Sequence, residues 1–248
     1  MITRRQSILV LPSFALAGCL ATANNSGIIR AASTASKALS LTDDEVRGYA
    51  AQMAKKMDAE AKIAPANNKY AQRLTTLTSG LQEDKGLRLN YKVYLTPEVN
   101  AFAMADGTIR FYSGLMDMMT DDEIRYVIGH EIGHVHSGHT KKRMQTALSA
   151  SAIQTAAASS GNAQVATLAN SELGDLIVKV VKAQHSQSNE NEADDYAMEF
   201  LSRRNFQRKA AVTALEKLDK LSGGRESNWL STHPAPKERA ARMSSKLV

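Results

Sequence analysis

The segment 127–135, VIGHEIGHV, contains the motif H-E-x-x-H and restricts the fold of this chain more than any other stretch. In an α-helix with about 3.6 residues per turn, His130 and His134 lie roughly 40° apart around the axis, so both imidazoles can reach one metal ion. Glu131 lies beside them, where its carboxylate can accept a proton from a water molecule on that metal. The motif therefore predicts a helix with two zinc ligands, His130 and His134, and a general base, Glu131.

The residues around the motif favour a helix that begins near Thr120. Three acidic residues at 121–123 follow this threonine, which is the sequence pattern of a capping box, and acids also suit the positive end of the helix dipole. Apolar residues then recur at helical spacing at positions 124, 127, 128 and 135. This spacing turns the motif toward the interior of the protein.

A catalytic zinc ion usually has three protein ligands and one open position, so a third ligand must come from elsewhere in the chain. His136 and His139 are the nearest candidates in the sequence. On a continuous helix they would point about 240° and 180° around the axis from His130, away from the metal. We therefore expect the third ligand to lie on a different segment.

The segment 189–201, NENEADDYAMEFL, is predicted to form a second helix. Glu190 and Asp194 lie one turn apart on its apolar face, where unpaired carboxylates would be costly but a metal and its histidines would satisfy them. We expect Glu190 to be the third ligand and Asp194 to accept a hydrogen bond from a ligand imidazole. Glu192 and Asp195 lie on another face and are expected to be surface acids. An ordinary acidic helix start is the alternative interpretation.

Together these segments resemble a known family. HEIGH, followed about 60 residues later by E-x-x-x-D within NENEADDYA, is similar to the HtpX-like and CAAX-prenyl-protease family of zinc metallopeptidases. The segments 100–103 and 113–116 and the pair His233-Pro234 fit the same family, so the resemblance covers roughly residues 40–245. One departure is that many members carry Ser-Arg ahead of the ligand glutamate, whereas Gln187 follows the serine here.

The resemblance implies a gluzincin-type endopeptidase that hydrolyses polypeptides. Its single Zn²⁺ would be held by His130, His134 and Glu190, with Glu131 as the general base. The implied fold is zincin-like.

The segment 88–112 changes from helical spacing to alternation and predicts a small antiparallel β-sheet. Helices predicted over 42–61, 68–81 and 207–221 make the fold mainly α, with that small sheet. In zincins an edge strand beside the metal can pair with the substrate backbone. We expect that strand to be formed by Asn100, Ala101, Phe102 and Ala103. A strand that only packs is the alternative, because edge strands are common.

Residues 1–18 have the features of a lipoprotein signal peptide. Two arginines precede an apolar stretch, and Leu-Ala-Gly-Cys at 16–19 is similar to a lipobox. Cleavage before Cys19 and acylation of this residue would anchor the chain to a membrane. Cys19 is the only cysteine, so no intramolecular disulfide can form. No later run of 18 or more apolar residues is present to predict a transmembrane helix.

The remaining chain is expected to comprise a tether at 19–40, rich in Ala, Ser and Asn, and one metallopeptidase domain at 41–248. Without residues 1–18 it has 29 basic and 25 acidic residues. This mild excess, with no basic run interleaved with aromatic residues, predicts no nucleic-acid partner.

His233 has several possible roles. It could occupy the fourth zinc position as a latch, or polarise the substrate carbonyl in the transition state and so be catalytic. The alternative is a histidine that only enters a helix beside Pro234.

The sequence thus predicts a periplasm-facing zinc endopeptidase, lipid-anchored in a bacterial cell envelope, that cuts misfolded envelope or outer-membrane proteins. Leu20 after Cys19, rather than Asp, favours the outer membrane over the inner membrane, and outer-membrane assembly machinery is a candidate partner. The alternative is a chaperone-like or assembly-partner lipoprotein whose zinc site is structural or latched. A Glu131→Gln change would separate the two, because only an enzyme needs the carboxylate.

Overall fold

The computed structural model describes residues 40, 42–147, 149, 183–223 and 228–247. The expected signal peptide, the expected tether up to residue 39 and Cys19 lie outside the described residues.

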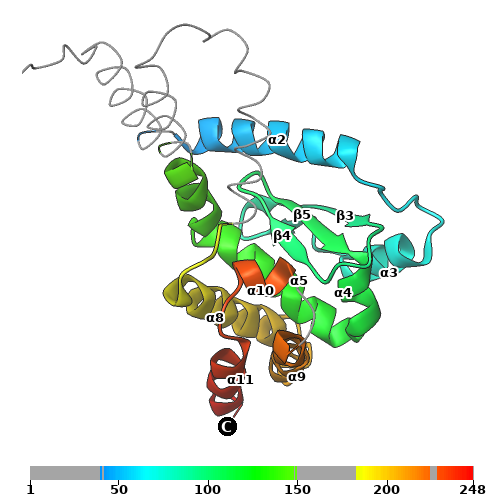
Figure 1. Ribbon diagram of the computed structural model, residues 1–248, viewed down its shortest axis with the longest axis vertical. Coiled ribbons are helices and arrows are strands. Elements are labelled where there is room, and N and C mark those ends of the chain that lie inside the picture. Colours follow the sequence, from blue (N-terminus) through cyan, green and yellow to red (C-terminus); the bar gives the residue numbers. More distant parts are fainter. Residues whose placement is uncertain (1–39, 41, 148, 150–182, 224–227, 248) are drawn as a thin grey trace, which may run out of the picture.

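Helix α5 (Asp121–His136) carries the H-E-x-x-H motif through the middle of the protein (Figure 1). It begins as its sequence predicts, because the Thr120 side chain accepts a hydrogen bond from the Glu123 backbone N–H and the Glu123 carboxylate accepts one from the Thr120 N–H. Every residue from Tyr126 to Val135 is buried. The helix is therefore enclosed by other elements along most of its length.

Helix α8 (Gln187–Arg203) packs against α5 along its length. Two glycines one turn apart on α5 allow this close approach. A Cβ atom on Gly129 would lie 2.8 Å from the Phe200 ring, and one on Gly133 would lie 3.0 Å from Ala193 Cα. These glycines let α8 bring its own polar side chains within reach of the motif.

A three-stranded sheet covers the other side of α5. It is formed by β3 (Asn90–Tyr94), β4 (Ala101–Ala103) and β5 (Thr108–Tyr112), in the order β3-β5-β4. Strand β4 pairs antiparallel with β5, but β3 pairs parallel with β5, so the expectation of an antiparallel sheet was wrong for that pair. The parallel pairing arises because the connection at 95–100 crosses the end of β5, so that β4 lies on the opposite side of β5 from β3. At this crossing the Gly114 N–H, just after β5, donates a hydrogen bond to the Thr96 carbonyl.

A separate antiparallel pair, β1 (Glu83–Asp84) and β2 (Leu87–Arg88), turns at Lys85 and Gly86.

Helix α2 (Asp43–Glu60) crosses the face of the sheet opposite α5 (Figure 1). It packs through Val46, Ala50 and Met53 on aromatic residues of the sheet. Helix α3 (Lys69–Leu77) lies beside β3 and is shorter than predicted, because the chain turns at Gly80 with a φ of 70°. Helix α4 (Ser113–Met118) connects β5 to α5.

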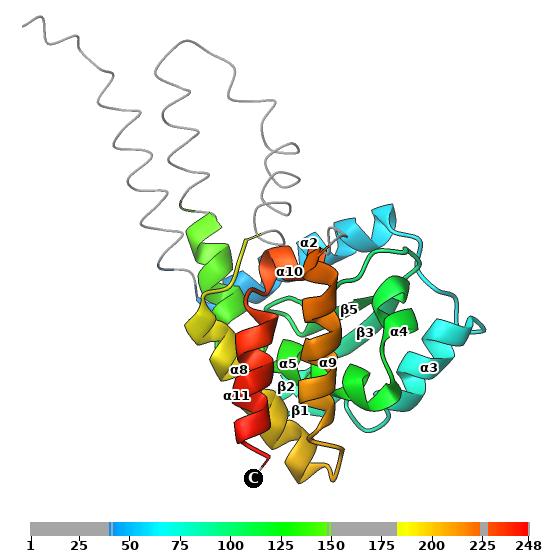
Figure 2. The same ribbon diagram turned by 60° about the horizontal axis from the view of Figure 1, so that its bottom comes forward.

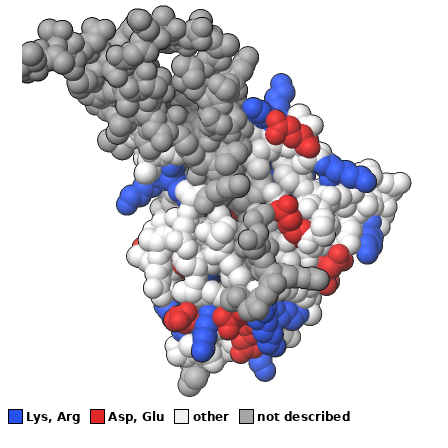
Figure 3. Space-filling view, viewed as in Figure 1, with Lys and Arg blue, Asp and Glu red and all other residues white. Residues whose placement is uncertain are grey.

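The C-terminal part comprises α9 (Ala210–Asp219), the 3₁₀ turn η1 (Lys220–Gly223), α10 (Asn228–Thr232) and α11 (Pro236–Ser245). Helix α11 runs beside α9 and contacts α8, as Figure 2 shows. The structure thus confirms a mainly helical fold with small sheets. Among the described helices, none is both long and apolar enough to cross a membrane. Basic and acidic side chains are interspersed on the face in Figure 3.

Candidate metal centre

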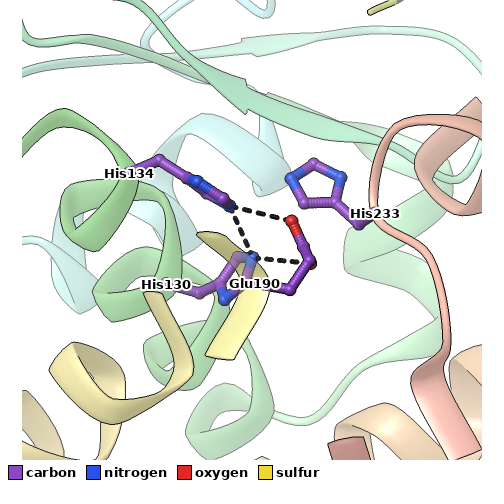
Figure 4. Close-up of side chains that lie close together, drawn as sticks. All are labelled: His130, His134, Glu190 and His233. Carbon is purple, nitrogen blue, oxygen red and sulfur yellow. Dashed lines mark hydrogen bonds and ion pairs between the residues drawn. The ribbon is translucent and has the colours of Figure 1, made fainter. Parts of the chain in front are cut away.

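Four buried side chains converge beside α5 (Figure 4). His130 and His134 come from α5, Glu190 comes from α8, and His233 follows α10. Their potential ligand atoms all lie within 4.8 Å of one another. The Nε2 atoms of His130 and His134 are 3.0 Å apart, and the Glu190 carboxylate oxygens lie 3.6 Å and 3.3 Å from them, respectively.

These separations fit a metal ion. Two ligand atoms about 2.0–2.1 Å from a tetrahedral zinc ion lie roughly 3.3 Å from each other, close to the separations found here. Glu190 Oε1 and His233 Nε2 are buried without a hydrogen-bond partner in the part of the chain that the structure describes. Two imidazoles and a carboxylate are also the ligand set of several zinc hydrolases. The residues present therefore suit a zinc ion.

Asp194 lies behind the imidazole of His130, where the sequence predicts it. Its Oδ1 is 3.0 Å from His130 Nδ1 and accepts a 2.7 Å hydrogen bond from the Tyr126 hydroxyl. Burial tends to raise the pKa of this carboxyl, but the nearby Arg239 and His130 outweigh that effect and hold it well below its usual value. Asp194 is thus an ionised acceptor that fixes the His130 ring with Nε2 toward the cluster.

Arg239 of α11 is part of the site, although no sequence motif indicates a role for it. It is 1% exposed and donates to both oxygens of Asp194, at 2.8 Å and 2.7 Å, and to Glu190. Burial raises the pKa of Glu190 to about 8, with Arg239 opposing the rise. Its position in the helix that follows His233 was the one sequence feature that linked Arg239 to the site. This feature was not sufficient for a prediction, because an arginine in such a helix is usually exposed.

Two further histidines surround His134. Helix α5 ends at His136, and Gly138, with a φ of 70°, turns the chain, so His139 lies beside His134 rather than pointing away as on a continuous helix. As expected, His139 is not among the four clustered ligand candidates of the described residues. Its Nδ1 lies 3.1 Å from His134 Nδ1. His185 stacks on the His134 ring, with 3.8 Å between centroids. Only the exposed His136, among the six histidines of the chain, is remote from the cluster.

Glu131 lies beside the cluster and is 2% exposed. Burial raises the pKa of its carboxyl to about 7, while the positive charges of Arg143 and Arg239 limit the rise. Its Oε1 lies 3.5 Å from His233 Nε2 and has no hydrogen-bond partner among the described residues. A carboxyl with a pKa near neutrality can both accept and release a proton at physiological pH.

A cavity of about 10 Å³, close to the volume needed for one water molecule, adjoins Glu131. Six of its described lining residues have a buried side-chain atom without a hydrogen-bond partner: Asn100, Glu131, Thr140, Arg143, His185 and His233. The cavity is therefore rich in groups that could bind a polar molecule.

Strand β4 forms one wall of this cavity. It is an edge strand among the strands that the structure describes, as expected, but it begins at Ala101 and does not include Asn100. Asn100, Ala101, Phe102 and Ala103 are all buried, so other parts of the protein cover this edge.

A helix that presents H-E-x-x-H, with a glutamate from a second helix completing the cluster, defines a metallopeptidase of the zincin class. Comparisons with known proteins agree with this assignment to a class of metallopeptidases. The model of peptidase family M48 matches residues 69–247. The chain therefore belongs to peptidase family M48 and is a zinc metalloendopeptidase, which confirms the resemblance to HtpX-like metallopeptidases.

Three relatives come from Escherichia coli (strain K12). Metalloprotease LoiP is 46% identical over 245 residues, which cover 98% of this chain and 96% of LoiP. Metalloprotease YcaL is 38% identical over 214 residues, or 86% of this chain and 84% of YcaL. A beta-barrel assembly-enhancing protease is 30% identical over 159 residues, or 58% of this chain and 31% of that protein.

Proposed function

We propose that His130, His134 and Glu190 hold the zinc ion of this peptidase and that Glu131 is its general base. The convergence of these three buried ligand candidates, with an unpartnered oxygen of the Glu131 carboxylate beside them, is the observation that carries the proposal. A zinc ion bound there would polarise the scissile carbonyl and lower the pKa of a water molecule. Glu131 would take a proton from that water and pass it to the leaving amine.

The substrate backbone is proposed to pair with β4, because this edge strand forms a wall of the cavity that also contains Glu131. The cavity holds no more than about one water molecule, so a peptide must displace part of its lining. His233 lies within the ligand cluster and has an unpartnered Nε2 among the described residues. These observations support a role for His233 either as a latch on the zinc ion or as the group that polarises the substrate carbonyl.

The proposed setting is the outer membrane of a bacterial envelope, with the lipid on Cys19 and the peptidase facing the periplasm. The sequence features at 1–19 support this location.

The proposed substrates are misfolded envelope or outer-membrane proteins, and the proposed partner is outer-membrane assembly machinery. One relative, whose name is beta-barrel assembly-enhancing protease, supports both proposals. Mass measurement of Cys19 would reject the anchor if no lipid were found. Envelope proteomes with and without active enzyme would reject the substrate class if nothing accumulated.

Casein hydrolysis by the purified protein, with and without a chelator and with bound zinc counted, tests the enzymatic proposal. Glu131→Gln should retain zinc and lose at least about a hundredfold in activity, because the proton acceptor is gone.

Zinc bound without activity in the wild type would favour the alternative, a chaperone-like lipoprotein with a latched site. The small cavity is also compatible with this alternative. Independently of that outcome, His233→Ala should raise the activity above the wild-type value if His233 is a latch. Lower activity with zinc retained would instead make His233 catalytic.

A further inference from the structure

No carboxylate of the described residues contacts the outer nitrogen of His134, Nδ1. This atom lies 3.1 Å from Nδ1 of His139, which is 6% exposed. The other nitrogen of His139, Nε2, lies 3.0 Å from Oε2 of Glu192. By contrast, His130 contacts Asp194 directly at 3.0 Å. The outer contact of His134 thus reaches a carboxylate through a second imidazole.

The positions of the protons in this chain of contacts follow from the cluster. His134 Nε2 faces His130 and Glu190, so if it binds a metal its proton must be on Nδ1. That N–H donates to His139 Nδ1, which leaves the His139 proton on Nε2. The His139 Nε2–H then donates to the Glu192 carboxylate. One arrangement of protons therefore satisfies all three side chains in sequence.

The fold brings His134, His139 and Glu192 together from three helical segments. The turn at Gly138 returns the chain so that His139, the first residue of the next helical segment, lies beside His134. Glu192 lies on α8, two residues after Glu190. The side chain of Glu192 is 57% exposed, and its Oε1 accepts a 3.4 Å hydrogen bond from the Ser188 hydroxyl. The expectation that Glu192 is only a surface acid misses this contact.

We propose that His139 and Glu192 are positioning residues for the zinc ion. They hold the His134 ring with Nε2 toward the cluster and increase its basicity, as direct carboxylate partners do in other zinc sites. The inference rests on the proposed function, because it requires His134 to be a zinc ligand. The competing interpretation is that His139 only packs between α5 and α8, in which case Glu192 has no influence on the metal.

Zinc affinity of the metal-free full-length protein, measured in competition with a chromophoric chelator, tests the proposal. His139→Ala and Glu192→Ala should each weaken zinc binding about tenfold or more. The double variant should be no weaker than His139→Ala alone, because both changes break one chain of hydrogen bonds. His139→Gln should recover part of the affinity, since its amide offers one acceptor and one donor.

Two control variants match these changes. Glu199→Ala removes an acid from the same helix with the same 57% exposure, which pairs with Lys85 rather than with the site. His136→Ala removes the exposed histidine of α5. Both should leave zinc affinity unchanged.

Zinc affinity that stays at the wild-type value in Glu192→Ala would overturn the proposal, whatever His139→Ala does. This variant changes an exposed residue and is expected to fold, which urea unfolding of the metal-free protein would verify. A fall in folding stability of His139→Ala without a fall in zinc affinity would likewise favour mere packing. If the wild type bound no zinc at all, the proposed function would fail together with this inference, so the two failures are distinguishable.

Discussion

Arg239 shows how strongly single residues at this site depend on their partners. It is buried and pairs with two buried carboxylates, Asp194 and Glu190. A buried charge is tolerated only when it is paired, and removing one partner leaves the others uncompensated. Arg239 balances the ionised Asp194, while the raised pKa of Glu190 shows that its charged form lacks sufficient compensation, which a metal cation at the cluster would supply.

Arg239→Met is expected to lower the free energy of unfolding of the metal-free protein by about 3 kcal/mol or more, because the ionised Asp194 loses its counter-charge and Glu190 loses a hydrogen-bond donor. Saturating zinc should reduce this loss, since the dication would neutralise Glu190. Urea unfolding with and without zinc would measure both effects.

Arg242→Met is the matched control for that measurement. Arg242 lies on the same helix, is 30% exposed and pairs with Asp195, so its loss should cost below about 1 kcal/mol. Equal costs for the two substitutions would contradict the special role of Arg239.

Among the elements, the separation of α5 and α8 determines whether the proposed zinc ligands meet. His130 and His134 lie on one helix and Glu190 on the other. The backbones approach closely where α5 has glycine, and a Cβ on Gly133 would lie only 3.0 Å from the Ala193 carbonyl oxygen. The backbone of Ala193 cannot move aside as a flexible side chain can. A methyl group on residue 133 must therefore increase the distance between α5 and α8.

Gly133→Ala should therefore destabilise the fold by about 1–3 kcal/mol, despite the higher helix propensity of alanine. It should also weaken zinc binding, because Glu190 moves away from the two histidines. Gly48→Ala is the control: Gly48 is exposed on α2, a Cβ atom there would have no neighbour within 4 Å, and alanine should stabilise by about 0.5–1 kcal/mol. Unfolding curves and zinc titrations of both variants would measure these changes in stability and zinc affinity. A stabilised Gly133→Ala would refute the packing argument.

Across the molecule as a whole, one carboxylate joins the N-terminal helix α2 to the sheet. Asp58 accepts hydrogen bonds from Arg110 at 2.8 Å and 2.9 Å, from Lys92 at 2.6 Å and from the Tyr94 hydroxyl at 2.7 Å. Burial tends to raise its pKa, but these donors, led by Arg110, lower it to about 2. Arg110 is only 2% exposed, so it depends on this pairing.

Because the folded-state pKa of Asp58 lies below its unfolded value, its stabilisation is present above about pH 4 and is lost as pH falls toward 2. Asp58→Asn should lower the free energy of unfolding by about 2 kcal/mol at pH 7. The difference from the wild type should shrink as pH falls below about 4. Urea unfolding of the metal-free proteins at several pH values would test this. A difference that stayed constant with pH would show that the charge of Asp58 is not responsible.

The relative positions of side chains within a single helix could be predicted from the sequence alone. The period of about 3.6 residues places His130 beside His134 and Glu190 one turn from Asp194, whatever surrounds them. The capping box likewise sets the start of α5 through residues three positions apart. Such local relations depend on backbone geometry within one segment.

Contacts between distant residues, by contrast, required the packed fold. His139 and His185 reach His134 because the chain turns back at Gly138 and returns through another segment. Arg239 reaches the site because α11 packs against α8. The parallel pairing of β3 with β5 depends on where a loop crosses the sheet. These contacts arise from packing of whole elements, which no spacing within one segment of the sequence specifies.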